Sequence, residues 1–483
     1  MTSRIERNKR KKNLLKTKIQ SMPKKILIII AIHIFFMITV MFIQNLDYSG
    51  KVALFAFLSA MTLWVTTKIS AGWVAITLIM FIIVMNAAEP DLLYNSLSEK
   101  VVWLMIGAFI IGEAVKNSGL AERLTAYILN KSDKKENVVL GLSSVLFATA
   151  FFIPSTSGRA ALSMPIMKQL SQKFSSKEKN ILAIIAPVVI LMSTSATLIG
   201  AGSHLIGIGF LESTAGESIS YIQWLLWGAP FALVVTFLSL VVIKMMLWPR
   251  DSEEQIVSER SGETIILTEP FEKDEQKTLI LILFLIIGWM TESLHGLDIE
   301  LITIIGAIIF MIPNYGIITW KQGMNAVSWN LVMFVAAATA LGKVLVDTGI
   351  VDWMENEMIS FLHLFVGAPD WLIVLMILVV TVTSHLYITS HTTRAIVFIP
   401  GLILFSELIG VNPSTVVFLS LIGMNYCVTV PVSSKALLLF YEEGDISFDA
   451  RNLVKLSTVL MPLYIFIIML FYFTFWQWTG MHL

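Results

Sequence analysis

Two short polar runs each lie in the middle of a long apolar segment. They read Pro154-Ser155-Thr156-Ser157-Gly158-Arg159 and Thr389-Ser390-His391-Thr392-Thr393-Arg394, within segments 138–171 and 370–408. The apolar arm on each side of a polar run has roughly 14–19 residues, and a helix of about 15 residues rises only some 22 Å. Because a membrane core is about 30 Å thick, we predict two re-entrant hairpins whose tips stop near its middle.

The composition of the whole chain is that of a membrane protein. Of 483 residues, 56% are hydrophobic and 14% are charged, whereas about a quarter of a soluble domain is charged. The basic residues 1–25 do not have the pattern of a cleavable signal peptide. The single cysteine, Cys427, excludes an internal disulfide and a cysteine-based metal cluster.

Apolar blocks of membrane-crossing length recur along the chain. We therefore predict an all-α polytopic membrane protein with about eleven transmembrane spans in addition to the two hairpins. The predicted spans are 26–44, 52–69, 72–88, 101–118, 180–211, 222–247, 277–293, 298–313, 329–347, 413–441 and 455–478.

The basic residues predict how these spans are oriented. Lys and Arg crowd residues 1–25 and recur in every second loop, whereas the alternate loops hold only Lys51 and Lys100. By the positive-inside rule, the N-terminus is cytoplasmic and the C-terminus is outside. The first hairpin then opens inward and the second outward. We expect a multi-pass protein of a bacterial plasma membrane.

The chain repeats itself at an offset of about 230–235 residues. The motif Ser155-x-x-x-Arg159-Ala matches Ser390-x-x-x-Arg394-Ala, and Ser203-His204 matches Ser434-Lys435. Each half would contain five spans and one hairpin, so the two halves are predicted to be inverted repeats, as in many transporters. The predicted divisions are a basic N-terminus (1–25), a first span and loop (26–51), repeat 1 (52–247, hairpin 138–171), a cytoplasmic linker (248–276) and repeat 2 (277–483, hairpin 370–408).

Arg159 and Arg394 are predicted to begin the second arm of each hairpin, where free N–H groups of the helix also point toward the tip. A charge at the bilayer centre costs roughly 2.5–3.5 kcal/mol, so such residues usually face a pathway or a partner. Glu113 is the only clear acid within a span, and one carboxylate cannot neutralise this centre. Two guanidinium forks suit an oxyanion such as a carboxylate, sulfate or phosphate.

The predicted anion site joins the hairpin tips to two interrupted spans, at Ser193–His204 and at Tyr426–Lys435. His204 and His391 are either neutral donors, groups that protonate during transport, or packing residues. The candidate substrate-binding residues are Ser155, Thr156, Ser157, Gly158, Arg159, Ser203, His204, Ser390, His391, Thr392, Thr393, Arg394, Ser434 and Lys435.

The span that ends in Lys116-Asn117-Ser118-Gly119-Leu120, the hairpin tips and the Gly-rich breaks resemble the divalent anion:sodium symporter family of the ion transporter superfamily. The resemblance covers the chain after its first span. It implies a homodimer in which a hairpin-containing domain moves like an elevator against a scaffold. It also implies sodium sites at the tips and breaks, with Ser155, Gly200, Ser390 and Thr392 as candidate ion ligands.

The tips depart from the family pattern. Where the family has Ser-Asn-Thr, this chain has Ser155-Thr156-Ser157 and Ser390-His391-Thr392, and an arginine follows each tip. A sodium ion about 5 Å from either arginine would be repelled by roughly 3 kcal/mol at an effective dielectric near 20. We therefore expect sodium to be absent or reduced, with anion exchange or proton coupling in its place. A sodium-coupled dicarboxylate symporter is the alternative.

A membrane enzyme that acts on a phosphate or lipid-linked group is the alternative from another class. It would need a catalytic base or metal ligands, and the sequence has no HExxH motif, paired Asp or Cys/His cluster. The sequence therefore favours a secondary active transporter of a small multivalent anion, such as a di- or tricarboxylate or sulfate. We expect no organic cofactor and no nucleic-acid partner, with Na⁺ or H⁺ as the candidate coupling ions.

Overall fold

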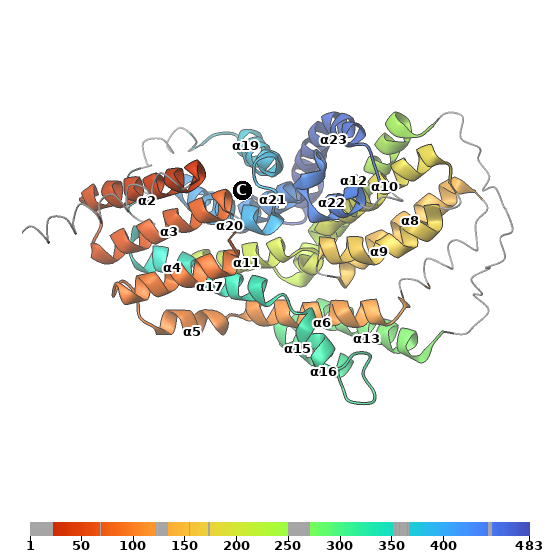
Figure 1. Cartoon of the computed structure of the whole chain (residues 1–483), viewed down its shortest axis with the longest axis horizontal. Helices are drawn as coiled ribbons and strands as arrows, with labels where there is room; N and C mark the ends of the chain where they lie inside the picture. The colour runs from red at the N-terminus through yellow and green to blue at the C-terminus, as the bar shows by residue number, and fades with distance from the viewer. Residues whose placement is uncertain are drawn as a thin grey trace, which may run out of the picture.

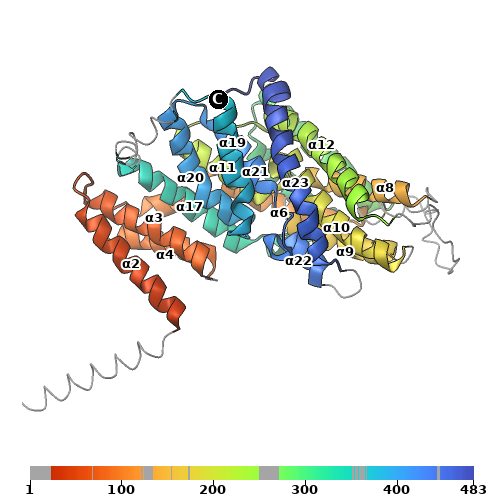
Figure 2. The ribbon, with the colours of Figure 1, turned by 90° about the horizontal axis from the view of Figure 1, so that it is seen from above.

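In the computed structural model, all regular elements of the described residues are helices (Figures 1 and 2). The structure describes residues 23–67, 69–120, 123, 134–153, 155–171, 174–249, 271–350, 353, 357, 365, 367–442 and 447–483. The predicted N-terminus 1–25 therefore lies almost wholly outside the described residues, and so does the larger part of the predicted linker 248–276.

The helices up to the linker lie at one end of the molecule (α2–α5), at the other end (α8–α10) and between them (Figure 1). Their bounds are α2 Lys24–Phe42, α3 Tyr48–Thr66, α4 Ala71–Val84, α5 Asp91–Leu97, α6 Lys100–Asn117, α8 Lys135–Ala148, α9 Thr156–Ser171, α10 Ser176–Met192, α11 Gly202–Ala215 and α12 Tyr221–Leu247. Short 3₁₀ turns, η1 Thr149–Phe151, η2 Ser193–Ala196 and η3 Leu198–Gly200, lie at the interruptions.

The helices after the linker belong to the second half of the chain. Their bounds are α13 Lys273–Met290, α14 Glu292–His295, α15 Ile299–Phe310, α16 Trp320–Ala326, α17 Trp329–Asp347, α19 Asp370–Thr383, α20 His391–Ile409, α21 Pro413–Asn425, α22 Lys435–Glu442 and α23 Ala450–Phe471. The turns η4 Ser384–Leu386 and η5 Pro431–Ser433 interrupt them, and a π-helical turn, Tyr472–Trp476, continues α23.

Six described helices are long and apolar enough to cross a membrane. They are Lys24–Phe42, Ser176–Ala196, Tyr221–Leu247, Trp329–Asp347, His391–Ile409 and Ala450–Trp476. Only Val40 of α2 is buried, so this helix presents an apolar surface that lipid can cover. The length and composition of these helices are those of a polytopic membrane protein.

Two predicted spans contain shorter helices than expected. In 72–88 the helix α4 has 14 residues, and in 298–313 the helix α15 has 12. Each is followed by a turn that contains an asparagine with positive φ, 52° at Asn86 and 65° at Asn314. Asparagine tolerates this left-handed conformation better than other residues with a Cβ, which favours a turn at these positions. Each helix therefore ends before its apolar run does.

The polar runs interrupt the helices where the sequence predicts. The hydroxyl of Ser155 accepts a hydrogen bond from the backbone N–H of Gly158 (3.1 Å), and the hydroxyl of Ser390 accepts one from Thr393 (3.2 Å). Each serine therefore caps the second arm of its segment, and each arginine follows in the first turn. At Gly200 a Cβ would lie 2.2 Å from the Thr194 carbonyl oxygen, so only glycine fits there.

The interrupted helices exchange partners between the two halves of the chain. The arm α9 packs against α10 and against α22, and the arm α20 packs against α21 and against α11. Likewise α6 packs against α15 and α16, while α17 packs against α4 and α5. The four segments that carry the candidate site residues are thus held against one another.

Candidate functional site

Arg159 ties the first hairpin to the first helix break. Its side chain is fully buried, and its Nε donates to the Thr149 hydroxyl at 2.9 Å. Its Nη2 donates to the Leu146 carbonyl (2.9 Å) and to the Ser193 hydroxyl, and its Nη1 reaches the Thr194 hydroxyl at 3.5 Å. These acceptors satisfy the donors of Arg159. All of them are neutral, so the positive charge is not compensated.

Arg394 has the equivalent position in the second hairpin but fewer partners. It is also fully buried, and its Nη1 donates to the Tyr426 carbonyl at 3.2 Å. Its Nε and Nη2 have no hydrogen-bond partner among the described residues. The Cys427 thiol lies beside the guanidinium, and a neutral thiol is only a weak acceptor. Unpaired buried donors are costly, which marks this group as a candidate ligand for an anion.

His391 lies one turn before Arg394 and shares its surroundings. Its Nε2 is 3.1 Å from the Cys427 sulfur, and its Nδ1 is buried without a partner among the described residues. His391 and Arg394 together therefore present three buried nitrogens that no described protein group contacts through a hydrogen bond.

His204 is placed differently, because protein groups lie within hydrogen-bond reach of both its ring nitrogens. Nδ1 is 3.2 Å from the Thr197 carbonyl oxygen, and Nε2 is 3.1 Å from Oδ1 of Asn425. The ring also stacks on Trp224, with centroids 4.5 Å apart. His204 therefore connects the two helix breaks rather than offering a free donor.

Asn425 is a central residue that the sequence analysis missed. Its amide nitrogen donates to the Ser195 hydroxyl (2.9 Å), 230 residues away. Asn425 directly precedes the second predicted break, and this position was the signal that could have identified it.

The other candidate residues are placed at various depths. Ser203 and Ser434 are buried, and the Ser434 hydroxyl accepts a hydrogen bond from Ala436 N at 3.1 Å. Lys435 is exposed at the start of α22 and stands apart from the buried cluster. Ser390 is exposed, and the remaining tip residues are half-buried: Ser155, Thr156, Ser157, Gly158, Thr392 and Thr393.

A continuous chain of contacts therefore runs through the site. It leads from Arg159 to Ser193 and Thr194, continues at the adjacent Ser195 to Asn425, and reaches Arg394 through Tyr426. The ion pairs of the described residues do not include either arginine. The described residues also contain no group of His, Cys, Asp and Glu that could hold a metal ion. The centre is thus positively charged and uncompensated.

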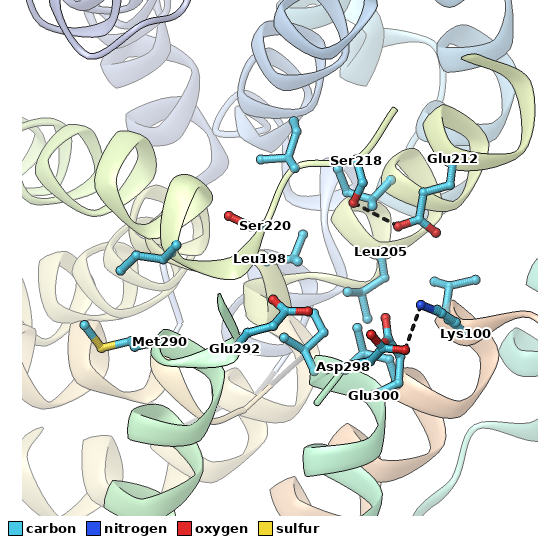
Figure 3. Close-up of a pocket in the computed structure, with 16 residues that line it drawn as sticks. Lys100, Leu198, Leu205, Glu212, Ser218, Ser220, Met290, Glu292, Asp298 and Glu300 are labelled. Carbon is cyan, nitrogen blue, oxygen red and sulfur yellow. Dashed lines mark hydrogen bonds and ion pairs between the residues drawn. The ribbon is translucent and has the colours of Figure 1, made fainter. Parts of the chain in front are cut away.

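A cavity of about 320 Å³ lies elsewhere, between α6, α11 and α15 (Figure 3). Four carboxylates line it, and its one cation, Lys100, is paired with Asp298 at 2.7 Å. The acidic residues of its lining are Glu212, Glu292, Asp298 and Glu300. Its net negative charge opposes the binding of an anion, so this cavity does not compete with the hairpin tips as an anion site.

Comparisons with known proteins identify the family of this chain. The model of the family described as the sodium:sulfate symporter transmembrane region matches residues 19–482. A sodium-dependent dicarboxylate transporter, SdcS, from Staphylococcus saprophyticus is 22% identical over 90% of this chain and 89% of its own length. The citrate/succinate antiporter of Escherichia coli K12 is 23% identical over 61% of this chain and 62% of its own length.

The fold is also similar to that of a solved structure. The YdaH transporter of Alcanivorax borkumensis superposes with a TM-score of 0.53 over 78% of this chain and 85% of that structure, at 14% identity. The family model and the curated relatives show that the class of protein is a multi-pass membrane transporter and not an enzyme. The chain belongs to the sodium:sulfate symporter family.

Proposed function

We propose that this protein is a secondary active transporter that binds a small multivalent anion between the two hairpin tips and the two helix breaks. The observation that carries the proposal is the pair of buried arginines, which lie on one chain of contacts without a carboxylate partner among the described residues. An anion would compensate this charge and accept hydrogen bonds from the free nitrogens. The membrane-enzyme alternative has no comparable support.

The substrate class that fits best is a di- or tricarboxylate, with sulfate as the alternative. The relatives include transporters named for dicarboxylates, for citrate and succinate, and for malate. A guanidinium binds a carboxylate through two parallel N–H groups, and sulfate offers the same pair of oxygens. The chemistry that both ligands share is a pair of oxygens bearing negative charge.

The two halves are proposed to be inverted repeats with about eleven spans and two re-entrant hairpins. The exchange of packing partners between α9 and α20, and between α6 and α17, supports this. So do the equivalent turns at Asn86 and Asn314. By the resemblance to its family, the carrier would be a homodimer that moves its hairpin-containing domain like an elevator. Its N-terminus would be cytoplasmic and its C-terminus outside, in a bacterial plasma membrane.

Anion exchange without sodium is the coupling that we favour. A sodium symporter uses cations to neutralise its anion, and here two arginines already supply positive charge. The hydroxyls of Ser155 and Ser390 cap helices, which leaves them fewer lone pairs for an ion. Proton coupling would fall to His391, because His204 has partners at both ring nitrogens. Sodium coupling through Ser155, Gly200, Ser390 and Thr392 is the alternative.

The test is uptake of radiolabelled succinate, citrate and sulfate into proteoliposomes, with protein-free liposomes as the control. We expect uptake of at least one of these anions to require unlabelled anion inside and to be unchanged when choline replaces sodium. A loss of affinity greater than about tenfold in choline, roughly 1.4 kcal/mol, would restore the sodium symporter. Absence of uptake for all three anions under every gradient would overturn the transport proposal.

A further inference from the structure

The two arginines differ in the hydrogen bonds that one edge of the guanidinium group makes. Nε and Nη2 lie on the same edge and donate in parallel, which is the geometry that receives two oxygens of one anion. In Arg159 this edge is used by Thr149, Leu146 and Ser193. In Arg394 the same edge, both Nε and Nη2, is buried without a geometrically defined hydrogen bond among the described residues, and the Cys427 thiol beside the guanidinium is only a weak acceptor.

The sequence of the two halves explains this difference. Arg159 finds hydroxyl acceptors at Ser193 and Thr194, at the end of α10. The two breaks have matching backbone conformations at an offset of 233 residues, at Thr197 and Val430 and again at Ala201 and Ser434. This offset places Tyr426 and Cys427 at the positions equivalent to Ser193 and Thr194. The Tyr426 hydroxyl contacts Val428 and Ser457, and the Cys427 thiol is only a weak acceptor, so the second half lacks the two hydroxyl acceptors.

The end of the first arm carries a hydroxyl in both halves. Thr149 accepts from Arg159 Nε and donates to the Leu146 carbonyl. Its counterpart at an offset of about 235 residues, Ser384, donates in the same way to the Thr381 carbonyl but accepts no hydrogen bond from Nε or Nη2 of Arg394. The free edge of Arg394 therefore depends on how its hairpin packs as well as on the side chains of the second break.

We propose that Arg394 is the anion ligand and that Arg159 is a positioning residue that holds the first hairpin tip on the first helix break. This assignment rests on the transport function proposed above and divides it unequally between the repeats. The anion binds along the Nε–Nη2 edge of Arg394, with His391 Nδ1 as a neighbouring nitrogen. Arg159 contributes long-range positive charge but no hydrogen bond to the anion.

The two roles predict opposite effects on stability and on binding. Arg394→Ala removes a buried charge with unpaired donors, so the unliganded protein should unfold at the same temperature as wild type or higher. The rise in unfolding temperature caused by succinate or sulfate should disappear. Arg159→Ala strands hydroxyl and carbonyl partners, so the unliganded protein should unfold several degrees lower while the anion-induced rise persists.

Conservative variants test the same division without removing the arginine charge. Thr149→Val takes one acceptor from Arg159, and Ser384→Ala is the matched control at the equivalent position, where no arginine bond is lost. In uptake assays, Thr149→Val and Arg159→Lys should lower the maximal rate while the half-saturating concentration stays within about twofold. Arg394→Lys should raise the half-saturating concentration about 30-fold or more, because an ammonium cannot reproduce the planar fork.

The experiment separates failure of this inference from failure of the proposed function. If succinate, citrate and sulfate neither stabilise wild type nor enter proteoliposomes, the transport proposal fails. If they bind wild type but Thr149→Val or Arg159→Lys weakens binding as much as Arg394→Lys, both arginines are ligands and the division is overturned. The division is also overturned if Arg394→Ala still shows the full anion-induced stabilisation. Should Arg159→Ala fail to fold, the two conservative variants decide.

Discussion

At the scale of single residues, Asn425 is the contact between the two helix breaks. Its amide lies between the His204 ring and the Ser195 hydroxyl, and all three are buried. Because each of these polar groups relies on the others for its hydrogen bonds, removing one leaves a buried group unsatisfied. His204 therefore connects the two helix breaks, and its role in substrate binding stays a prediction.

We predict that Asn425→Ala lowers the free energy of unfolding by about 1–3 kcal/mol, the cost of stranding buried polar groups. The measurement is thermal or denaturant unfolding of the purified protein in detergent. Ser420→Ala is the matched control. Ser420 is buried in the same helix, but its hydroxyl donates only to the Val416 carbonyl one turn earlier in that helix. Equal stability of the two variants would show that the link between the breaks contributes nothing.

At the scale of elements, the close crossing of α19 and α21 depends on a glycine. A Cβ at Gly423 would lie 2.2 Å from the Thr381 hydroxyl oxygen and 3.1 Å from its Cβ. Any side chain at position 423 would therefore push these two helices apart.

We expect Gly423→Ala to destabilise the protein by about 1–3 kcal/mol through overpacking. Adding Thr381→Ala should restore part of this loss, since the Thr381 hydroxyl bonds only within its own helix. Gly401→Ala, in the neighbouring α20, has nothing within 4 Å of the added Cβ and should be neutral or stabilising. The double variant being less stable than Gly423→Ala alone would argue against the steric explanation.

The short helices α5 and α16 show a limit of sequence reasoning at this scale. Each has seven residues, so neither forms an apolar run of membrane-crossing length. The capping box of Thr319 and Gln322 at the start of α16 was a local signal for a helix. Both helices pack on long neighbours, α5 on α17 and α16 on α6, and tertiary contacts stabilise helices that would be marginal alone.

At the scale of the whole molecule, the orientation in the membrane is a prediction from charge. A cysteine at Ser176 should react with a membrane-impermeant thiol reagent from the cytoplasmic side, and one at Ser213 from the outside. Wild type is the control, because its single cysteine, Cys427, is buried. Labelling of the Ser176→Cys variant from outside would reverse the predicted orientation of the first hairpin.

Much of the architecture is determined by the sequence itself. Apolar runs, serine caps and glycine- or proline-containing interruptions act over a few residues, so the positions of Arg159 and Arg394 in the first turn of an arm could be predicted locally. The departure of both tips from the family pattern was equally visible. Local chemistry and bilayer thickness are sufficient for these features.

Only the tertiary structure decided which donors of each arginine are used. The acceptors of Arg159 lie up to 35 residues away, and Asn425 lies 221 residues from His204. A hydrogen bond requires its two atoms to be within about 3.5 Å and aligned, and that depends on how distant helices pack. Two arginines that look equivalent in the sequence therefore have a fully hydrogen-bonded edge in one half and, among the described residues, an unpaired edge in the other.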